Sequence, residues 1–307
     1  MKGKFTPKQA TRLAFALLGA TSAQGLADTA TLPPVADTSL FEFEPNNNFG
    51  ASGNLPVGTI FTGFRCRLLL RFDVAAALPP AATVTRASLT MTVVSIKDTG
   101  PANSNFQLHR MLVPWVEGNK AGQEGQPAAA GETTWNARLA PAVLWSQPGA
   151  AAPADFSPQV SGSTLFLGPG DYTFASNSNL VADVQFWLQH SNSNFGWILV
   201  SDQEATPATA RRIDSRENRG HPPTLTVEFS APQPPQIDGI THVQDHVQIF
   251  FPLPANAVYD VQYKTSLGTQ TWWPLTRLGP NAFPTNAVVE DSISPGNFRC
   301  YRVGTAP

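Results

Sequence analysis

The chain has 307 residues, of which 42% are hydrophobic and 14% are charged, and its formal net charge is −2. This length predicts about two domains. A weakly acidic chain is a poor candidate for general nucleic-acid binding, which depends on basic side chains that neutralise phosphates. The composition therefore favours a globular protein without a nucleic-acid partner.

The N-terminal segment has the order of a secretory signal peptide. Four basic residues come first without any acid, an apolar run covers residues 13–18, and small residues dominate positions 19–27. We predict a signal peptide at residues 1–27, cleaved after Ala23 or Ala27. Its removal leaves 16 basic residues against 22 acidic ones, a formal charge of −6.

The expected location follows from this segment. We expect a secreted protein, extracellular or at the cell surface, with the periplasm as the alternative. No later stretch approaches the roughly 20 apolar residues of a transmembrane helix, so no membrane insertion is expected.

Short β-type runs alternate with turn residues along positions 28–230. Many short strands with turn signals are typical of an antiparallel β-sandwich. One helix is predicted at residues 180–189, where apolar residues recur at helical spacing. Residues 119–133 and 140–158, rich in Gly, Ala and Pro, are predicted loops. The predicted strands cover residues 39–44, 65–72, 87–96, 105–112, 163–167, 196–201, 210–215 and 224–230.

A proline-rich spacer at residues 231–236 separates this first domain from a second one at residues 237–307. We predict a small fibronectin type III or immunoglobulin-like β-sandwich there. Cys66 and Cys300 fall in different domains, and we predict a buried thiol at Cys66 in preference to a disulfide between the two. The predicted strands of the second domain cover residues 247–251, 259–264, 272–276, 287–291 and 299–303.

Residues 64–73 are the most informative strand candidate. Successive strand side chains point to opposite faces, so the apolar residues at positions 64, 66, 68, 70 and 72 lie opposite a face that carries Arg65, Arg67 and Arg71. Each guanidinium offers a planar fork of donors that fits a carboxylate. The three arginines therefore suit either a buried ion-pair ladder or a surface that receives an acidic ligand, and they are candidate ligand contacts.

A second charged cluster follows at residues 211–217. If the strand there continues, Arg212 and Arg216 share a face and could extend the first arginine row into one basic groove. The alternative is a structural network in which Asp73, Asp214 and Glu217 neutralise the arginines, because buried charges persist only when they are paired.

His109 and Trp135 complete the candidate ligand contacts. An exposed tryptophan can stack on a sugar ring through its apolar face. Trp135 and Trp145 lie in or beside predicted loops and are the best candidates for exposure. The alternative for both is burial in a core, which is commoner for tryptophan in a sandwich.

Asp37 and Asn47 are candidates for a structural calcium site. The turn at residues 46–50 offers side-chain oxygens, the ligand type that calcium prefers. No spaced calcium-binding loop is present, and a plain turn is the alternative. No other cofactor is expected.

No enzyme activity is expected. The sequence has no nucleophile elbow, phosphate-binding loop or paired-histidine metal motif. One alternative is a polysaccharide lyase or hydrolase that uses His109, Tyr172 or an acid. The other is a structural or adhesive surface protein in which Arg67 and Arg71 are buried and ion-paired.

A series of short motifs runs through the first domain: Asp37 with residues 46–50, then residues 67–73, 78–80, 87–89, 109–110, 115–118, 134–135, 194–196, 215–217 and 223–225. In this order, the motifs of residues 28–230 resemble the DNRLRE domain, a secreted β-sandwich of the carbohydrate-binding-module type related to disaggregatase repeats. The resemblance implies a non-catalytic jelly-roll that binds polysaccharide, with alginate-like acidic glycans as one ligand class. Residues 237–307 resemble a small C-terminal module of secreted bacterial proteins, which implies a role in spacing or attachment.

Overall fold

The computed structural model describes residues 27–96, 102–218, 220–231, 235–243, 245–255, 258–294 and 298–306. The predicted signal peptide, apart from Ala27, lies outside these described residues, as do residues 232–234 of the predicted spacer. Among the described residues, no helix is long and apolar enough to cross a membrane.

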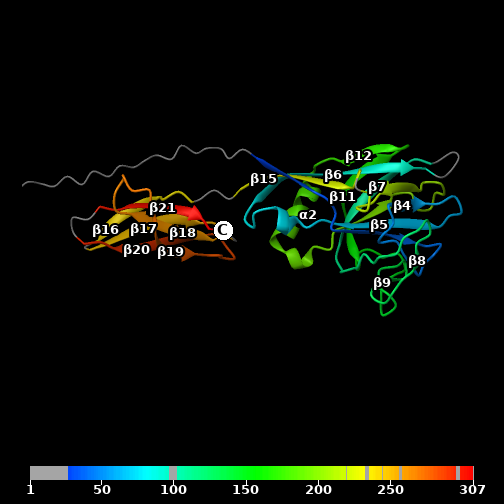
Figure 1. The fold of residues 1–307 in the computed structure, drawn as a ribbon, viewed down its shortest axis with the longest axis horizontal. Helices are drawn as coiled ribbons and strands as arrows, with labels where there is room; N and C mark the ends of the chain where they lie inside the picture. Colours follow the sequence, from blue (N-terminus) through cyan, green and yellow to red (C-terminus); the bar gives the residue numbers. More distant parts are fainter. Residues whose placement is uncertain are drawn as a thin grey trace, which may run out of the picture.

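The described chain is almost entirely β, and the predicted all-β sandwich is confirmed (Figure 1). Two helices, α1 (Val74–Ala77) and α2 (Ser178–Gln189), and a 3-10 turn (Ser191–Ser193) interrupt the strands of the N-terminal sandwich. These strands are β1 (Asp28–Leu32), β2 (Ala36–Phe41), β3 (Asn47–Asn48), β4 (Asn54–Thr59), β5 (Arg65–Arg71), β6 (Thr83–Ser95), β7 (Ser104–Met111), β8 (Gln126–Pro127), β9 (Ala137–Leu139), β10 (Val143–Leu144), β11 (Phe156–Phe166), β12 (Gly170–Phe174), β13 (Trp197–Ser201), β14 (Arg211–Asp214) and β15 (Thr224–Ser230).

One curled antiparallel sheet makes both layers of the sandwich. Its strands follow the order β1-β15-β6-β14-β4-β5-β13-β7-β11, with β12 beside β6 and β2 beside β5. Strand β4 joins the two layers, because its first residues pair with β14 and its last two, Gly58 and Thr59, pair with β5. Gly58 has a φ of +102°, and a Cβ there would lie 2.8 Å from the backbone oxygen of Thr209. Glycine tolerates both the positive φ and this close approach. Strand β4 can therefore bend at Gly58 and pass from one layer of the sandwich to the other.

An inner core fills the space between the two layers. Alternate residues of β4, β5, β6, β7, β13 and β15 point into it, and α2 adds Leu180, Val184 and Trp187. Asn177 caps the N-terminus of α2. Its side chain accepts hydrogen bonds from the backbone N–H groups of Asn179 and Leu180, which the first turn of the helix leaves without partners. The predicted helix is therefore confirmed, and it lies against the sandwich core.

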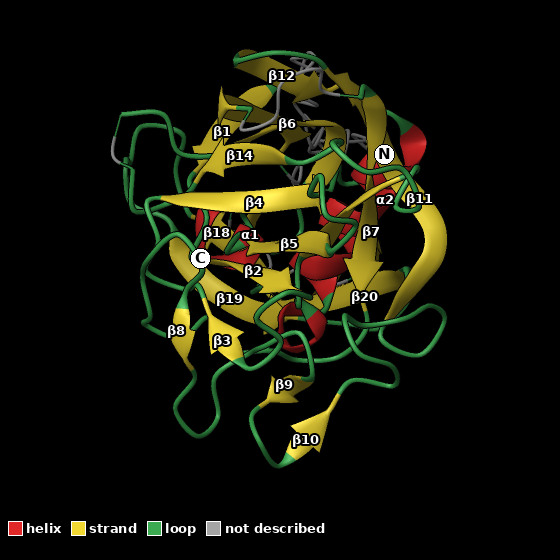
Figure 2. Cartoon of the chain, turned by 90° about the vertical axis from the view of Figure 1, so that its right-hand side faces the viewer, coloured by secondary structure: helices red, strands yellow, loops and turns green. Residues whose placement is uncertain are grey.

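An outer core lies on the other face of the β5 layer. Leu69 and Ile198 project from the sheet and pack with Trp115, Trp135 and Trp145 from the connections between β7 and β11. Figure 2 shows the short strands β8, β9 and β10 of these connections outside the sandwich, together with β3, which comes from the connection between β2 and β4 and pairs with β8. The layer that contains β5 is therefore buried on both faces.

The C-terminal unit has a core of its own, built around Val247, Ile249, Phe251 and Val261. Its strands form two three-stranded antiparallel sheets, β16-β17-β20 and β19-β18-β21. The bounds are β16 (Gly239–Val243), β17 (His246–Leu253), β18 (Tyr259–Lys264), β19 (Trp273–Leu278), β20 (Thr285–Ser292) and β21 (Cys300–Thr305).

The predicted strands match the observed ones within a few residues, apart from β6 and β11. Strand β6 starts at Thr83, and β11 starts at Phe156, so the predicted loop at residues 140–158 ends earlier than expected. Strands β1, β4, β12 and β16 were not predicted, and neither were the short strands β3, β8, β9 and β10, of which β8 and β10 lie within the predicted loops. Strand β4 contains Pro56 and Gly58, residue types that usually mark the end of a strand.

Candidate functional site

Arg67 lies on the outer face of β5, as the alternation predicted, and is enclosed. Only 10% of its side chain is exposed. Its Nε and Nη2 atoms donate to the two carboxylate oxygens of Glu204 at 2.7 and 2.5 Å, and Nη1 donates to the backbone oxygens of Gly149 and Ala150. All three guanidinium nitrogens therefore have partners inside the protein.

Arg65, at the start of β5, is more accessible. Its side chain is 38% exposed and makes a two-pronged ion pair with Glu42, with N···O distances of 2.9 and 2.7 Å. Hydrogen bonds from Arg65 lower the pKa of Glu42. The guanidinium carbon also lies 5.1 Å from the ring centre of Trp135, a favourable cation–π arrangement.

Arg71, at the end of β5, is half-buried, and its guanidinium carbon lies 5.7 Å from the centre of the Trp115 ring. The indole N–H of Trp115 donates to the backbone oxygen of Phe195, which fixes the ring. Arg71 therefore packs against an aromatic side chain of the outer core.

Trp135 and Trp145 were the candidates for exposure, with burial in a core as the commoner alternative, and both are buried. Trp135 is 2% exposed, and Trp145 is also buried, with its indole N–H donating to the backbone oxygen of Thr134. Gly149 lies so close to the Trp135 ring that a Cβ there would be 2.6 Å from two ring atoms. Both side chains bury the outer face of the sheet, which explains their position in loops.

The second arginine row also has internal partners. Arg212 donates to the side chain of Asn54 and to the backbone oxygen of Gln123. Burial lowers the pKa of Arg212, because desolvation disfavours its charge. Strand β14 ends at Asp214, so Arg216 belongs to the following turn and does not continue the strand face.

The acids that pair with the arginines of β5 are not the predicted ones. Asp73 accepts from the backbone N–H of Ala76 at the start of α1, and Asp214 accepts from the side chain of Asn218. The observed partners are Glu42 for Arg65 and Glu204 for Arg67. Glu217 does pair with an arginine, which is Arg216.

His109 is buried on β7. Its Nδ1 lies 3.0 Å from the backbone oxygen of Ser157, and its ring packs beside that of Phe156. Burial lowers its pKa, because desolvation disfavours the imidazolium. The predicted buried thiol of Cys66 is confirmed, since Cys66 is unpaired and fully buried in the inner core.

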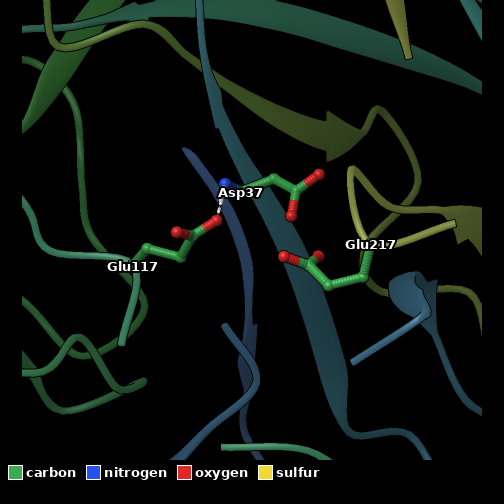
Figure 3. A group of neighbouring side chains, drawn as sticks. All are labelled: Asp37, Glu117 and Glu217. Atoms are coloured by element: carbon green, nitrogen blue, oxygen red, sulfur yellow. Dashed lines mark hydrogen bonds between the residues drawn. The ribbon is translucent and has the colours of Figure 1, made fainter. Parts of the chain in front are cut away.

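Asp37 is brought together with two other acids. We call Asp37, Glu117 and Glu217 the acid trio; one carboxylate oxygen of each lies within 4.8 Å of those of the other two. Asp37 comes from β2, Glu117 from the loop after β7, and Glu217 from the turn after β14. Figure 3 shows the Asp37 and Glu217 carboxylates directed toward each other. The Glu117 carboxylate accepts a hydrogen bond from the backbone N–H of Asp37.

Asn48 fixes the loop that carries Glu117. Its amide nitrogen donates to the backbone oxygen of Glu117 at 2.6 Å, and its amide oxygen accepts from the backbone N–H of Lys120. Gly118 has a φ of +83°, and a Cβ there would meet the Asn48 side chain at 2.3 Å. A side chain at position 118 would therefore displace the loop.

One arginine shares its charge among the acids of the trio. Arg216 places Nη1 3.1 Å from Glu117 and Nε 3.3 Å from Glu217, and its backbone N–H donates to Asp37 Oδ2 at 2.8 Å. Burial raises the pKa of Asp37 and of Glu117, because desolvation disfavours their ionised forms.

Asn47, the other predicted calcium ligand, lies at the β3–β8 pair, where its side-chain nitrogen donates to the backbone oxygen of Glu124. It lines a polar cavity of about 540 Å³. The acids that join Asp37 are Glu117 and Glu217, and their convergence was not predicted, because they lie on distant segments of the chain.

Three exposed phenylalanines lie at or near the turn between β4 and β5, and we call Phe43, Phe61 and Phe64 the hairpin aromatics. Phe61, in the turn itself, is 70% exposed. The rings of Phe43 and Phe64 meet edge to face with centres 5.2 Å apart. Sequence reasoning missed them; the available signal was an aromatic residue directly before the Thr62–Gly63 turn residues.

No protein-family model matches the chain, and no curated protein matches it.

Proposed function

We propose that this protein is an exported, non-catalytic carbohydrate-binding protein whose N-terminal sandwich contacts polysaccharide through the hairpin aromatics. The observation that carries the proposal is the exposure of Phe43, Phe61 and Phe64 at one end of a sandwich. Large aromatic side chains are usually buried, and exposed aromatic clusters mark binding surfaces. A ring face offers the apolar side of a sugar a large contact area.

The charge beside these aromatics argues for the sugar ring as the main contact. Arg65 follows Phe64 directly, but Glu42 already pairs with its guanidinium. An acidic polysaccharide would have to compete with that carboxylate. The resemblance to the DNRLRE domain agrees with a polysaccharide ligand, and alginate-like acidic glycans are the ligand class that this resemblance implies.

Affinity electrophoresis in gels that contain alginate, pectin, a sulfated polysaccharide or a neutral glucan tests the proposal. We expect at least one polysaccharide to retard the full chain at low salt. Phe61→Ala should weaken binding by about thirtyfold, which corresponds to the about 2 kcal/mol of an interface hot spot. Phe283→Ala is the matched control, because Phe283 is 79% exposed in the C-terminal unit.

Absence of retardation in every gel would overturn the proposal. So would a Phe61→Ala variant that binds as well as the Phe283→Ala control. Release of reducing ends or unsaturated products from any of the polysaccharides would contradict the non-catalytic assignment and support the lyase or hydrolase alternative.

A structural or adhesive protein without a glycan ligand is the second candidate. The enclosed Arg67–Glu204 pair favours it, because this candidate predicted burial and pairing at Arg67. Arg71 agrees with it only in part, since it packs on Trp115. In this candidate the hairpin aromatics contact protein, and sedimentation analysis should show self-association that Phe61→Ala removes.

A further inference from the structure

The acid trio combines three carboxylates with the guanidinium of Arg216, which pairs with two of them, and with Arg71, whose charge also favours the ionised form of Glu117. If all are ionised, Asp37, Glu117 and Glu217 carry three negative charges, and Arg216 balances one of them. Like charges held this close repel each other unless a cation lies between them. We propose that the acid trio binds one calcium ion, which ties β2, the loop after β7 and the turn after β14 together.

The spacing of the three carboxylates fits calcium. Calcium binds oxygen ligands at about 2.3–2.6 Å, so two ligands on opposite sides of the ion are about 5 Å apart. The oxygens of the trio lie within 4.8 Å of one another. Three oxygens at this spacing can share one coordination sphere without a change in the backbone.

Asp37 supplies an independent observation. Its side chain is 1% exposed, and Oδ1 is buried without any hydrogen-bond partner, whereas Oδ2 accepts from Arg216. A buried carboxylate oxygen without a partner destabilises the fold, because it has lost its hydrogen bonds to water and makes none inside the protein. Figure 3 shows the Asp37 carboxylate facing that of Glu217, and a cation held by the trio would compensate this buried charge.

The donor set selects the class of ion. Carboxylate oxygens are hard ligands that suit calcium, magnesium or manganese, whereas the thiolate and imidazole donors that suit zinc or copper are not part of the trio. Magnesium requires a tighter octahedral cage and keeps most of its water. A partly exposed site whose ligands come from three separate segments fits calcium better than magnesium, because calcium accepts variable coordination geometry.

The trio is open enough for an ion to enter. Glu117 and Glu217 are both partly exposed, and Arg216 lines a cavity of about 570 Å³ together with Val35 and Pro222. An ion can therefore reach the trio from solvent through the exposed parts of Glu117 and Glu217.

Isothermal titration of the EDTA-treated full chain with calcium chloride tests the proposal. We expect one calcium ion per chain, and a melting temperature that rises with calcium and falls again with EDTA. Glu217→Gln, which keeps the side-chain shape, should lower the affinity at least about tenfold. Glu228→Gln is the matched control, because Glu228 pairs with Arg86 on the sheet surface outside the trio.

Glu117→Gln provides a second removal of a ligand, and circular dichroism verifies that each variant is folded. No calcium binding by the wild-type chain up to about 10 mM, above the range of weak extracellular sites, would overturn the proposal. Unchanged affinity in folded Glu217→Gln or Glu117→Gln would also overturn it, and tighter binding of magnesium than of calcium would overturn the choice of ion. The trio shares no residue with the hairpin aromatics, so loss of calcium binding and loss of glycan binding are separable results.

Discussion

The two faces of strand β5 are both buried, but by different means. On the inner face, Cys66, Leu68 and Leu70 pack among apolar side chains of the opposite layer. On the outer face, Arg65, Arg67 and Arg71 lie among tryptophans that come from loops. One face is a regular sandwich core, and the other is a mixed layer of arginine, aromatic rings and backbone carbonyls.

This difference shows how a sheet face can be closed without regular secondary structure. An apolar core needs only volume and shape, whereas a buried guanidinium requires specific acceptors at fixed positions. The loops therefore have to be ordered before Arg67 can be buried. The outer face depends on long-range contacts that the inner face does not need.

Among changes to the two faces of β5, removal of the Arg67 side chain should lower the free energy of unfolding most. Arg67→Ala leaves Glu204 and two backbone oxygens without their donor, and removal of one partner of a buried ion pair costs about 3–5 kcal/mol. The free energy of unfolding in urea measures this loss. The control is Arg86→Ala, whose exposed pair with Glu228 should contribute at most about 1 kcal/mol. Equal losses in the two variants would show that the outer face tolerates an unpaired acid.

Leu70→Ala tests the inner face in the same strand. It should lower the free energy of unfolding by about 3 kcal/mol, because it leaves a cavity in a fully buried position. Leu70 and Arg67 share no partners, so the two losses should add to within about 0.5 kcal/mol in the double variant. A much larger coupling would mean that the two faces do not act independently.

Gly149→Ala tests the contact between a loop and the outer-face aromatics. A methyl group there would clash with the Trp135 ring and would also occupy a positive φ of +85°. We expect a loss of about 1–3 kcal/mol in thermal or urea unfolding. Gly131→Ala is a matched control, because Gly131 has a φ of +89° with open space around it. If both variants lose the same amount, the backbone conformation and not the ring contact is responsible.

Arg65→Gln should have the smallest effect. The Arg65–Glu42 pair is more exposed than the Arg67–Glu204 pair, and water screens its charges. The expected loss is about 0–1 kcal/mol, and it should shrink further when salt is added. A loss as large as that of Arg67→Ala would place Arg65 in the buried network.

The sequence allowed the alternation of β5 to be predicted, because the period of two is a local property of a strand. The covering of its outer face could not be predicted in the same way. Loops rich in Gly, Ala and Pro show no period, and nothing in them marked Trp135 as buried. The acids are remote as well, since Glu42 and Glu204 lie 23 and 137 residues from their arginines.

The members of the acid trio could also be predicted only in part from the sequence. Asp37 was a candidate metal ligand on the basis of its oxygen atoms and its neighbouring turn. Glu117 and Glu217 join it only because the curled sheet brings the loop after β7 and the turn after β14 to the start of β2. Residue type predicted the kind of ligand, and the topology determined the partners.

The buried thiol of Cys66 has a practical consequence. Burial raises its pKa, and the thiolate is the reactive form, so alkylating reagents cannot modify Cys66 while the sandwich is closed. Cys300 is partly exposed and would label first. Each folded chain therefore contains a fast thiol and a protected one, and the slow labelling of Cys66 measures how often the two layers separate under native conditions.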